Sequence, residues 1–279
     1  MATEQHTRLA RNFHRTFKPE RSYLSALLRY AAAGKSGSLE EISNHTGIPT
    51  GSSSGKVQPT IDYCTGMGLL RSKKTTTSYA FSLTPFGRVV LAEDPFLSNP
   101  VTQWLAHLQL CHPRKGADLW YQVFVEGMET LGMDFSRQTL ERHLRTVYAT
   151  AGRNPIGPVL GAYTDEAAFM GAGVLTEKDD QIHRAAAPLT TESRRGYAAW
   201  LAQLLVDFFP DTHHIPVTDW ERACGWKRAT GWHPSTAADM LAEAEHLGVL
   251  AVDRHMQPWL VELRRAPEDV WCTIFDDML

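Results

Sequence analysis

The chain of 279 residues is 43% hydrophobic and 21% charged, with a formal net charge of −3, which predicts a soluble globular protein of two or three units. No apolar run reaches the roughly 20 residues of a membrane-spanning helix, and no apolar signal core begins the sequence, so we expect a cytoplasmic protein without a membrane partner. The four cysteines lie far apart, which excludes a Cys-x-x-Cys site and predicts free thiols.

The first predicted unit, residues 1–92, begins with three helices. An apolar stripe at helical spacing predicts a helix over Arg21–Ala33, and Ser38 with Glu41 has the spacing of a capping box at the start of the second. A third helix is expected to begin near Lys56, with a proline in its first turn, where a missing N–H does no harm.

Two short β-runs follow the third helix, over Gly68–Arg71 and Ser78–Leu83. The connector between them, Ser72–Thr77, is basic and rich in hydroxyl groups, which predicts an exposed hairpin tip. Three helices followed by a hairpin is the order of a winged helix-turn-helix. In that arrangement we expect the third helix to enter the DNA major groove and the hairpin tip to contact phosphates.

The charges are unevenly distributed along the chain. Residues 1–90 hold 12 Lys and Arg against five Asp and Glu, a net +7, whereas the remaining 189 residues hold 16 against 26, a net −10. Such a split favours an anionic partner for the basic end, although uneven solvated charge is the plain alternative. The DNA contacts predicted for this end are Lys56, Gln58 and Thr60 on the third helix, Arg71, Lys73 and Lys74 on the hairpin, and Arg15 and Lys18 near the N-terminus.

The rest of the chain is predicted as a helical middle unit, residues 93–190, and a second winged-helix-like unit, residues 191–279. The run Gly248–Leu250 in the last unit parallels Gly68–Leu70 in the first, since each follows a predicted third helix. Lys227 and Arg228 are therefore further candidates for DNA contact, but the third helix of this unit is acidic, so docking to a partner is the alternative. The expected fold class is mainly α with small β-hairpins.

Catalytic motifs are scarce in this sequence. It holds no Gly-rich phosphate loop, no Gly-x-Ser-x-Gly and no His-Glu-x-x-His. Carboxylates remain as ligands for the Mg²⁺ of a nuclease, and Glu177 with Asp180, expected in a loop, is the candidate pair. Each carboxylate in the chain also fits a solvated surface or a helix cap, and Asp94 in particular is placed to cap the helix that follows it.

Four short motifs carry a family resemblance: Phe13–Phe17 (FHRTF), Leu83–Gly87 (LTPFG), Asp94–Leu97 (DPFL) and Trp104–Leu110 (WLAHLQL). Together they resemble the SspB-like components of single-stranded DNA phosphorothioation systems. This bacterial family was long described only as a domain of unknown function, encoded beside proteins similar to phosphoadenosine-phosphosulfate reductases. One departure is Ser98–Pro100, where the family pattern has an acidic residue that could share a metal with Asp94.

The resemblance implies a DNA-acting component that nicks DNA with Mg²⁺ to allow sulfur insertion, in a system that defends against phage. It also implies three partners: a cysteine desulfurase, an ATPase and a sulfur-transferring component. Two alternatives stay open at this point. The chain could be a winged-helix transcriptional regulator of the same operon, which predicts dimeric binding to one palindromic site, or a protein-binding scaffold of the modification complex, which predicts negligible DNA affinity.

Overall fold

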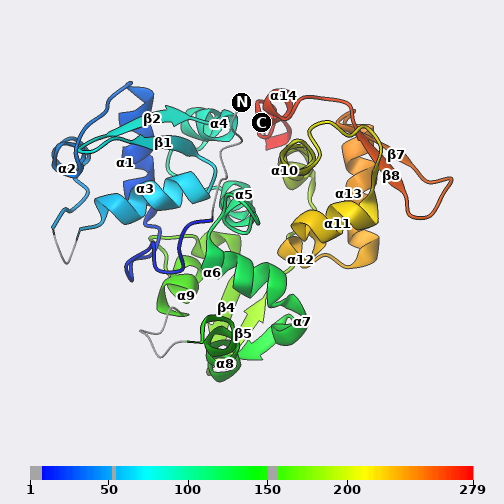
Figure 1. Cartoon of the computed structure of the whole chain (residues 1–279), viewed down its shortest axis with the longest axis horizontal. Helices are drawn as coiled ribbons and strands as arrows, with labels where there is room; N and C mark the ends of the chain where they lie inside the picture. Colours follow the sequence, from blue (N-terminus) through cyan, green and yellow to red (C-terminus); the bar gives the residue numbers. More distant parts are fainter. Residues whose placement is uncertain (1–7, 52–54, 150–155, 279) are drawn as a thin grey trace. The chain divides into compact units, whose positions relative to one another are not determined.

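Figure 1 shows the computed structural model of the chain, which describes residues 8–51, 55–149 and 156–278. The chain divides into two compact units, an N-terminal unit of residues 1–185 and a C-terminal unit of residues 186–279. The second divide expected from the sequence, near residue 190, lies close to this boundary. The divide expected near residue 92 falls inside the N-terminal unit, where the ring centroids of Tyr63 and Trp120, from either side of it, lie 5.9 Å apart.

The N-terminal unit combines helices with short antiparallel strands. Its helices are α1 (Arg21–Ala32), α2 (Leu39–Thr46), α3 (Val57–Gly66), α4 (Pro85–Glu93), α5 (Pro100–Leu110), α6 (Asp118–Tyr121), the π-helix η1 (Gln122–Glu126), α7 (Met128–Leu131), α8 (Arg137–Tyr148), α9 (Ile156–Thr164) and the 3₁₀ turn η2 (Met170–Ala172). Its strands are β1 (Leu70–Lys74), β2 (Tyr79–Leu83), β3 (Asp134–Ser136), β4 (Leu175–Lys178) and β5 (Gln181–Arg184).

Local sequence signals account for the first part of this unit. The capping box at the start of α2 is present: the Ser38 side chain accepts from the Glu41 backbone N–H at 3.2 Å, and the Glu41 carboxylate accepts from the Ser38 N–H at 2.7 Å. The Thr84 hydroxyl caps α4 and donates to the Gly68 carbonyl at 2.6 Å. A Cβ at Gly87 would lie 1.7 Å from the Leu69 carbonyl oxygen, so this close approach requires glycine.

A segment ahead of α1, residues 8–20, lies across α3, and we call it the strap. Leu9 forms a parallel bridge to Ala117, with its N–H donating to the Gly116 carbonyl at 2.9 Å. Phe13 is buried with its ring centroid 4.8 Å from that of Tyr63, and the Tyr63 hydroxyl donates to the Phe17 carbonyl at 2.9 Å. The strap thus covers a face of α3 that the sequence predicted to be exposed.

The middle of the chain is not purely helical, which corrects one expectation. Strands β3, β5 and β4 form a three-stranded antiparallel sheet, and the segment around Glu177 that the sequence analysis treated as a loop is the β4–β5 hairpin. These strands have three or four residues each, too short for alternation to separate them from loops. Helix α5 lies in the core of the unit, with Trp104, Leu105 and Leu108 buried.

The C-terminal unit repeats the order of helices and hairpin. Its helices are α10 (Thr191–Phe208), α11 (Val217–Cys224), α12 (Trp226–Thr230), α13 (Pro234–His246), α14 (Pro267–Trp271) and the 3₁₀ turn η3 (Asp276–Met278). Its strands β6 (Ile215–Pro216), β8 (Leu260–Leu263) and β7 (Leu250–Asp253) form one antiparallel sheet in that order. The fold is therefore mainly helical with small hairpins, as the sequence predicts; the winged-helix name for either unit stays an interpretation.

Candidate nucleic-acid interface

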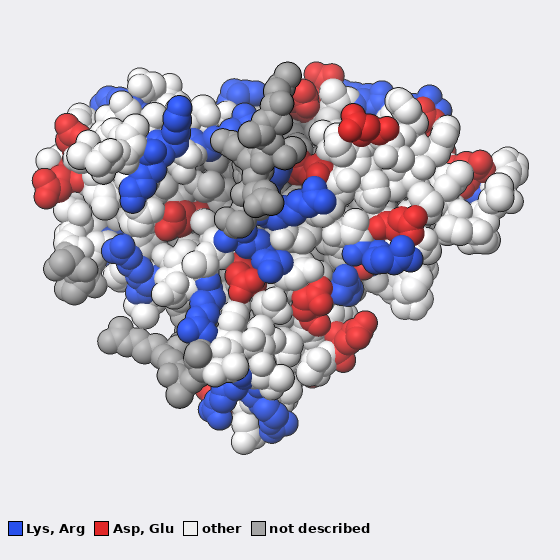
Figure 2. All heavy atoms as spheres, viewed as in Figure 1, with Lys and Arg blue, Asp and Glu red and all other residues white. Residues whose placement is uncertain are grey.

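The β1–β2 hairpin presents its cations to solvent. Arg71, Lys73 and Lys74 are all exposed, and the tip is closed by a Thr75 N–H that donates to the Ser78 carbonyl at 2.8 Å. On the face shown in Figure 2, Lys and Arg side chains lie over the region where Figure 1 places α3 and the hairpin. The tip is neither folded inward nor covered by another described segment of the N-terminal unit.

Helix α3 does not expose the face that base readout would need. Seven of its ten residues are buried, including Thr60, which is 5% exposed and donates its hydroxyl to the Lys56 carbonyl at 2.8 Å. The prediction that Thr60 reaches base edges is therefore wrong, and Tyr63 on the same helix is likewise buried. The physical reason is the strap, whose docking onto α3 depends on contacts between residues far apart in the sequence.

The two other predicted contacts on this helix are half-buried and already bonded. Lys56 Nζ lies 2.6 Å from Glu20 Oε1, and it also lies near the rings of Phe17 and Tyr23. Gln58 donates to the Asp62 carboxylate at 2.9 Å and accepts from the Tyr79 hydroxyl. Their side chains thus hold the strap and the hairpin to α3, and a contact of either with DNA stays a prediction.

One acidic group sits among the cations of this surface. Burial raises the pKa of Asp62 to about 6, while the hydrogen bond from Gln58 and the positive charges of Arg15 and Lys74 act in the opposite direction. Arg15 of the strap and Lys74 of the hairpin are thereby brought close to the same carboxylate. We call Arg15, Arg71, Lys73 and Lys74 the hairpin patch. Asp62 was not among the predicted site residues, although its i, i+4 spacing from Gln58 is a usable signal.

The remaining predicted DNA contacts lie outside this patch. Lys18 is paired with Asp165, on the loop after α9. In the C-terminal unit, Arg228 Nε lies 3.3 Å from Glu221 Oε1, and the Lys227 ammonium lies 5.1 Å from the centre of the Trp226 ring. Glu221 offsets the positive charge of this link, so the link is a weaker phosphate site than the hairpin patch.

The candidate metal pair does not fit a magnesium ion. Both carboxylate oxygens of Glu177 accept from the Arg137 guanidinium, the second at 2.8 Å. Asp180 is exposed in the β4–β5 turn, with its carboxylate 3.9 Å from Arg137 Nε. Mg²⁺ needs several oxygen ligands with open lone pairs. Because both Glu177 oxygens already accept hydrogen bonds from Arg137, and Asp180 offers only one exposed carboxylate, the pair is a poor magnesium site. Within residues 8–51, 55–149 and 156–278, no three His, Cys, Asp or Glu side chains form a metal cluster.

Asp94 holds the turn ahead of α5 and does not cap that helix, whose N-cap is Asn99. It is buried, and its carboxylate accepts from the backbone N–H groups of Ser98 and Asn99, just ahead of α5, at 2.9 and 3.0 Å. The Ser98 hydroxyl also lies 3.0 Å from the Asp94 carboxylate. In this chain the residues after the Asp-Pro-Phe-Leu motif thus satisfy Asp94 by hydrogen bonds, in place of the acidic residue of the family pattern.

Residues 60–156 match the family model described as a protein of unknown function, DUF4007. No curated protein sequence matches the chain. Two crystal structures of SspB are similar to it, one of them of the magnesium ion-bound protein. The magnesium-bound structure has a TM-score of 0.67 and 15% identity over 96% of this chain and 87% of SspB, and the other has 0.66 and 15% over 98% and 89%.

The similarity covers both units and nearly the whole length of each chain, so this chain has the SspB fold, as the short motifs in its sequence indicated. At 15% identity the similarity is one of fold. Among the described residues, no helix combines the length and the apolar character that a bilayer crossing requires.

Proposed function

We propose that this chain is the DNA-binding component of a bacterial DNA phosphorothioation and defence system. The SspB fold supports the assignment to such a system. The observation that carries the DNA-binding part is the β1–β2 hairpin. Residues 70–83 hold Arg71, Lys73 and Lys74 and no carboxylate, and all three cations are exposed.

The chemistry of the hairpin patch suits a phosphate backbone. Lys and Arg displace condensed counterions from DNA, which gives sequence-independent affinity that falls as salt rises. Hydroxyl groups at the tip, such as that of Thr76, can add hydrogen bonds to phosphate oxygens. Because α3 is largely buried, contacts to base edges play little part in this proposal. The same burial disfavours an operon regulator, which needs base readout to select one site.

The proposal extends to strand nicking that would open DNA for sulfur insertion. One SspB structure is magnesium ion-bound, and Mg²⁺ is therefore the metal to test here. The chain's own pair Glu177 and Asp180 does not fit that ion, so we assign no step of the reaction to it. The chain would act with a cysteine desulfurase, an ATPase and a sulfur-transferring component, and an assay with the chain alone separates intrinsic nicking from nicking that needs these partners.

The test measures binding and nicking side by side. Binding of labelled duplexes of two unrelated sequences is titrated across salt concentrations, and conversion of supercoiled to nicked plasmid is followed with Mg²⁺ or with EDTA. We expect equal affinity for both duplexes, a steep fall with salt, and nicking only with Mg²⁺. Tight binding to a single sequence would support a regulator, and negligible affinity at physiological salt would support a scaffold.

A further inference from the structure

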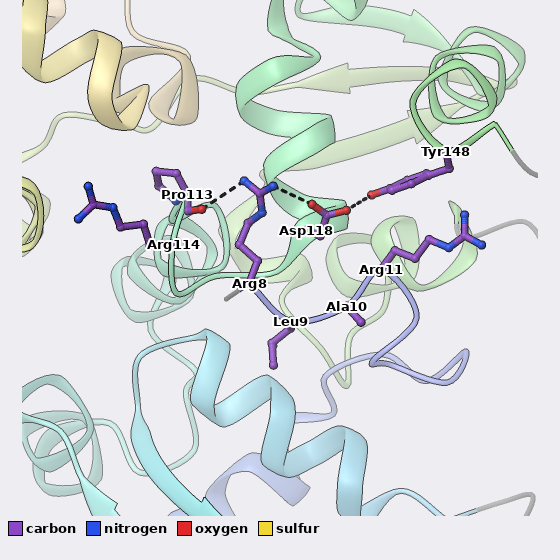
Figure 3. A pocket seen from close by; sticks show the side chains of 8 residues that line it. All are labelled: Arg8, Leu9, Ala10, Arg11, Pro113, Arg114, Asp118 and Tyr148. Carbon is purple, nitrogen blue, oxygen red and sulfur yellow. Dashed lines mark hydrogen bonds and ion pairs between the residues drawn. The ribbon is translucent and has the colours of Figure 1, made fainter. Parts of the chain in front are cut away.

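A pocket of 480 Å³ lies in the N-terminal unit, where three segments far apart in the sequence meet. The start of the strap, the α5–α6 loop and the end of α8 line it, as Figure 3 shows. Its lining residues are Arg8, Leu9, Ala10, Arg11, Pro113, Arg114, Asp118 and Tyr148. None of them belongs to the hairpin patch.

Backbone hydrogen bonds fix the walls of this pocket. The Leu9 N–H donates to the Gly116 carbonyl at 2.9 Å, and the Asp118 N–H donates to the Leu9 carbonyl at 3.0 Å. On the inner side, the Gly66 α-carbon faces the Leu9 side chain so closely that an added Cβ would lie 2.7 Å from it. The strap and the α5–α6 loop therefore form one preformed wall, and a ligand would not have to order it.

Arg8 is held at the centre of the pocket. Its Nη2 lies 3.0 Å from Asp118 Oδ1, its Nη1 donates to the Pro113 carbonyl at 3.2 Å, and its guanidinium carbon lies 4.2 Å from the centre of the Tyr121 ring. The second oxygen of Asp118 accepts from the Tyr148 hydroxyl at 2.8 Å. These contacts position the guanidinium, which has five N–H donors in a planar fork.

Two further arginines flank this centre. Figure 3 shows Arg114 and Arg11 extending on opposite sides of Arg8. The Arg11 guanidinium lies 5.1 Å from the centre of the Tyr148 ring, and Arg114 is exposed on the α5–α6 loop. With three arginines and one aspartate, the lining side chains have a net charge of +2. A guanidinium group matches a phosphate group through paired N–H···O hydrogen bonds, and here three of them are spread across the pocket instead of converging on one point.

We propose that this pocket binds the terminal phosphate of a DNA strand. This inference rests on the proposed function, since it assigns one part of the DNA substrate to the pocket. A terminal phosphate is a monoester of about −1.5 to −2 charge at pH 7, which balances the lining charge better than a backbone diester of one negative charge. The pocket is too small for a duplex but has the volume of sites that hold one nucleotide-sized group. Strand nicking produces such an end.

Short single-stranded oligonucleotides of one sequence test the proposal, with a 5′-phosphate, a 3′-phosphate or hydroxyl groups at both ends. We expect the purified full chain to bind one of the phosphorylated forms about tenfold more tightly than the hydroxyl form, as one or two charge-assisted hydrogen bonds provide. Equal affinity for all three would overturn the proposal. Competition by a free deoxynucleoside monophosphate as strong as by the phosphorylated strand would overturn the assignment to a strand end.

Variants locate the effect. Because Arg114 and Arg11 lie on opposite sides of Arg8, we expect one of the two variants Arg114→Gln and Arg11→Gln to reduce the phosphate preference to about twofold or less. Arg114 is exposed, so its substitution leaves the fold intact, and Arg142→Gln, at an exposed position on α8, is the matched control that keeps the preference. A preference unchanged in both pocket variants would place the site elsewhere.

Failure of this inference differs from failure of the proposed function. Duplex binding that depends on the hairpin patch, without any phosphate preference, would remove the pocket and leave the proposed function. A phosphate preference in a protein that binds no duplex would support the pocket and remove the proposed function.

Discussion

The two hairpin regions of this molecule share an order of elements and differ in charge. In each, a helix ends two residues before a left-handed glycine, Gly68 with φ of 66° or Gly248 with φ of 67°, and a strand begins two residues later. In both regions a third segment of the chain pairs with the second strand of the hairpin. Gly37 forms a bridge to Tyr79 in the first region, and β6 pairs with β8 in the second. The chain thus builds a similar scaffold twice.

The charges on these scaffolds separate their expected roles. Residues 70–83 carry three cations and no acid, whereas residues 250–263 carry Asp253, Arg254 and Glu262. In the second region Arg254 lies 2.7 Å from Glu245, and Arg264 lies 2.9 Å from Glu262. Both arginines thus form ion pairs within their own unit. We therefore expect the excess of exposed cations, and not the shape of the hairpin alone, to select a nucleic-acid partner.

The largest expected effect comes from reversing charge on the first hairpin. Lys73→Glu with Lys74→Glu is expected to weaken duplex binding about 100-fold at low salt, since two phosphate contacts of roughly 1.5 kcal/mol each are lost. Fluorescence anisotropy with two unrelated duplexes measures it, and both should weaken alike. The matched control is Arg254→Glu with Arg264→Glu, for which we expect at most a threefold change, about 0.6 kcal/mol. An equal loss of duplex affinity in both variants would show that the two hairpins contribute alike to DNA binding.

Transfer of charge to the second hairpin is the converse experiment. His255 and Met256 are exposed at its tip. Adding His255→Lys and Met256→Lys to the charge-reversed first hairpin is expected to recover about tenfold in affinity, because phosphate attraction depends on local charge. The same anisotropy titration reports it. No recovery would mean that features of the first hairpin other than charge carry the binding.

A smaller effect is expected at Asp62. Its pKa of about 6 means that the carboxylate is ionised at pH 7.5, where it lowers the positive potential around Arg15 and Lys74. Asp62→Asn keeps an oxygen for Gln58 and is expected to raise duplex affinity about threefold to fivefold at pH 7.5, a coupling of under 1 kcal/mol, with no difference at pH 5. A gain that persists at pH 5 would contradict the electrostatic explanation.

The same substitution changes stability with a defined sign. The folded pKa of Asp62 is raised above the unfolded value of about 3.9, so the native state binds the extra proton and stability falls as pH rises from about 4 to 6. Asp62→Asn removes this penalty and is expected to stabilise the fold by on the order of 1–2 kcal/mol at pH 7.5. This is less than the pKa difference alone would give, because the side chain is only half-buried and solvent screens part of the effect. Urea unfolding at pH 5 and pH 7.5 measures the difference.

The smallest effect is expected at the former metal candidates. Since Glu177 is saturated by Arg137, Glu177→Ala with Asp180→Ala should leave Mg²⁺-dependent nicking of plasmid within about twofold of the unmodified chain, while costing up to about 1 kcal/mol of stability from the lost ion pair. Thermal unfolding provides the stability control. Abolished nicking in a folded variant would restore this pair as a metal site.

Much of the fold follows from local signals. Apolar spacing located α1 to within one residue, and the Ser38–Glu41 capping box marked the start of α2. The glycine before each hairpin strand was visible as a repeated pattern. These features depend on residues a few positions apart, which is the range that sequence patterns cover.

The candidate interface was only partly predictable, because the strap connects distant parts of the chain. The motif Phe13–Phe17 is compatible with docking of its two aromatic rings on the first unit, but nothing near Thr60 indicates that they cover this helix. A helix face without strong apolar periodicity is instead predicted to face solvent. The arginine pocket had no sequence signal, since residues 8, 11 and 114 come together only through the Leu9–Ala117 bridge. Exposed cations on a local hairpin needed no such long-range information.

The strap also sets an order of events during synthesis. The strap forms hydrogen bonds with Gly116 and Asp118. More than a hundred residues must therefore be synthesised before the strap can pack in its native position. Until then the Tyr63 side of α3 is an apolar surface open to chaperones, because contacts at long sequence separation form late. The helices and hairpin of residues 21–92, cut out by themselves, would keep that surface bare and would be prone to aggregate.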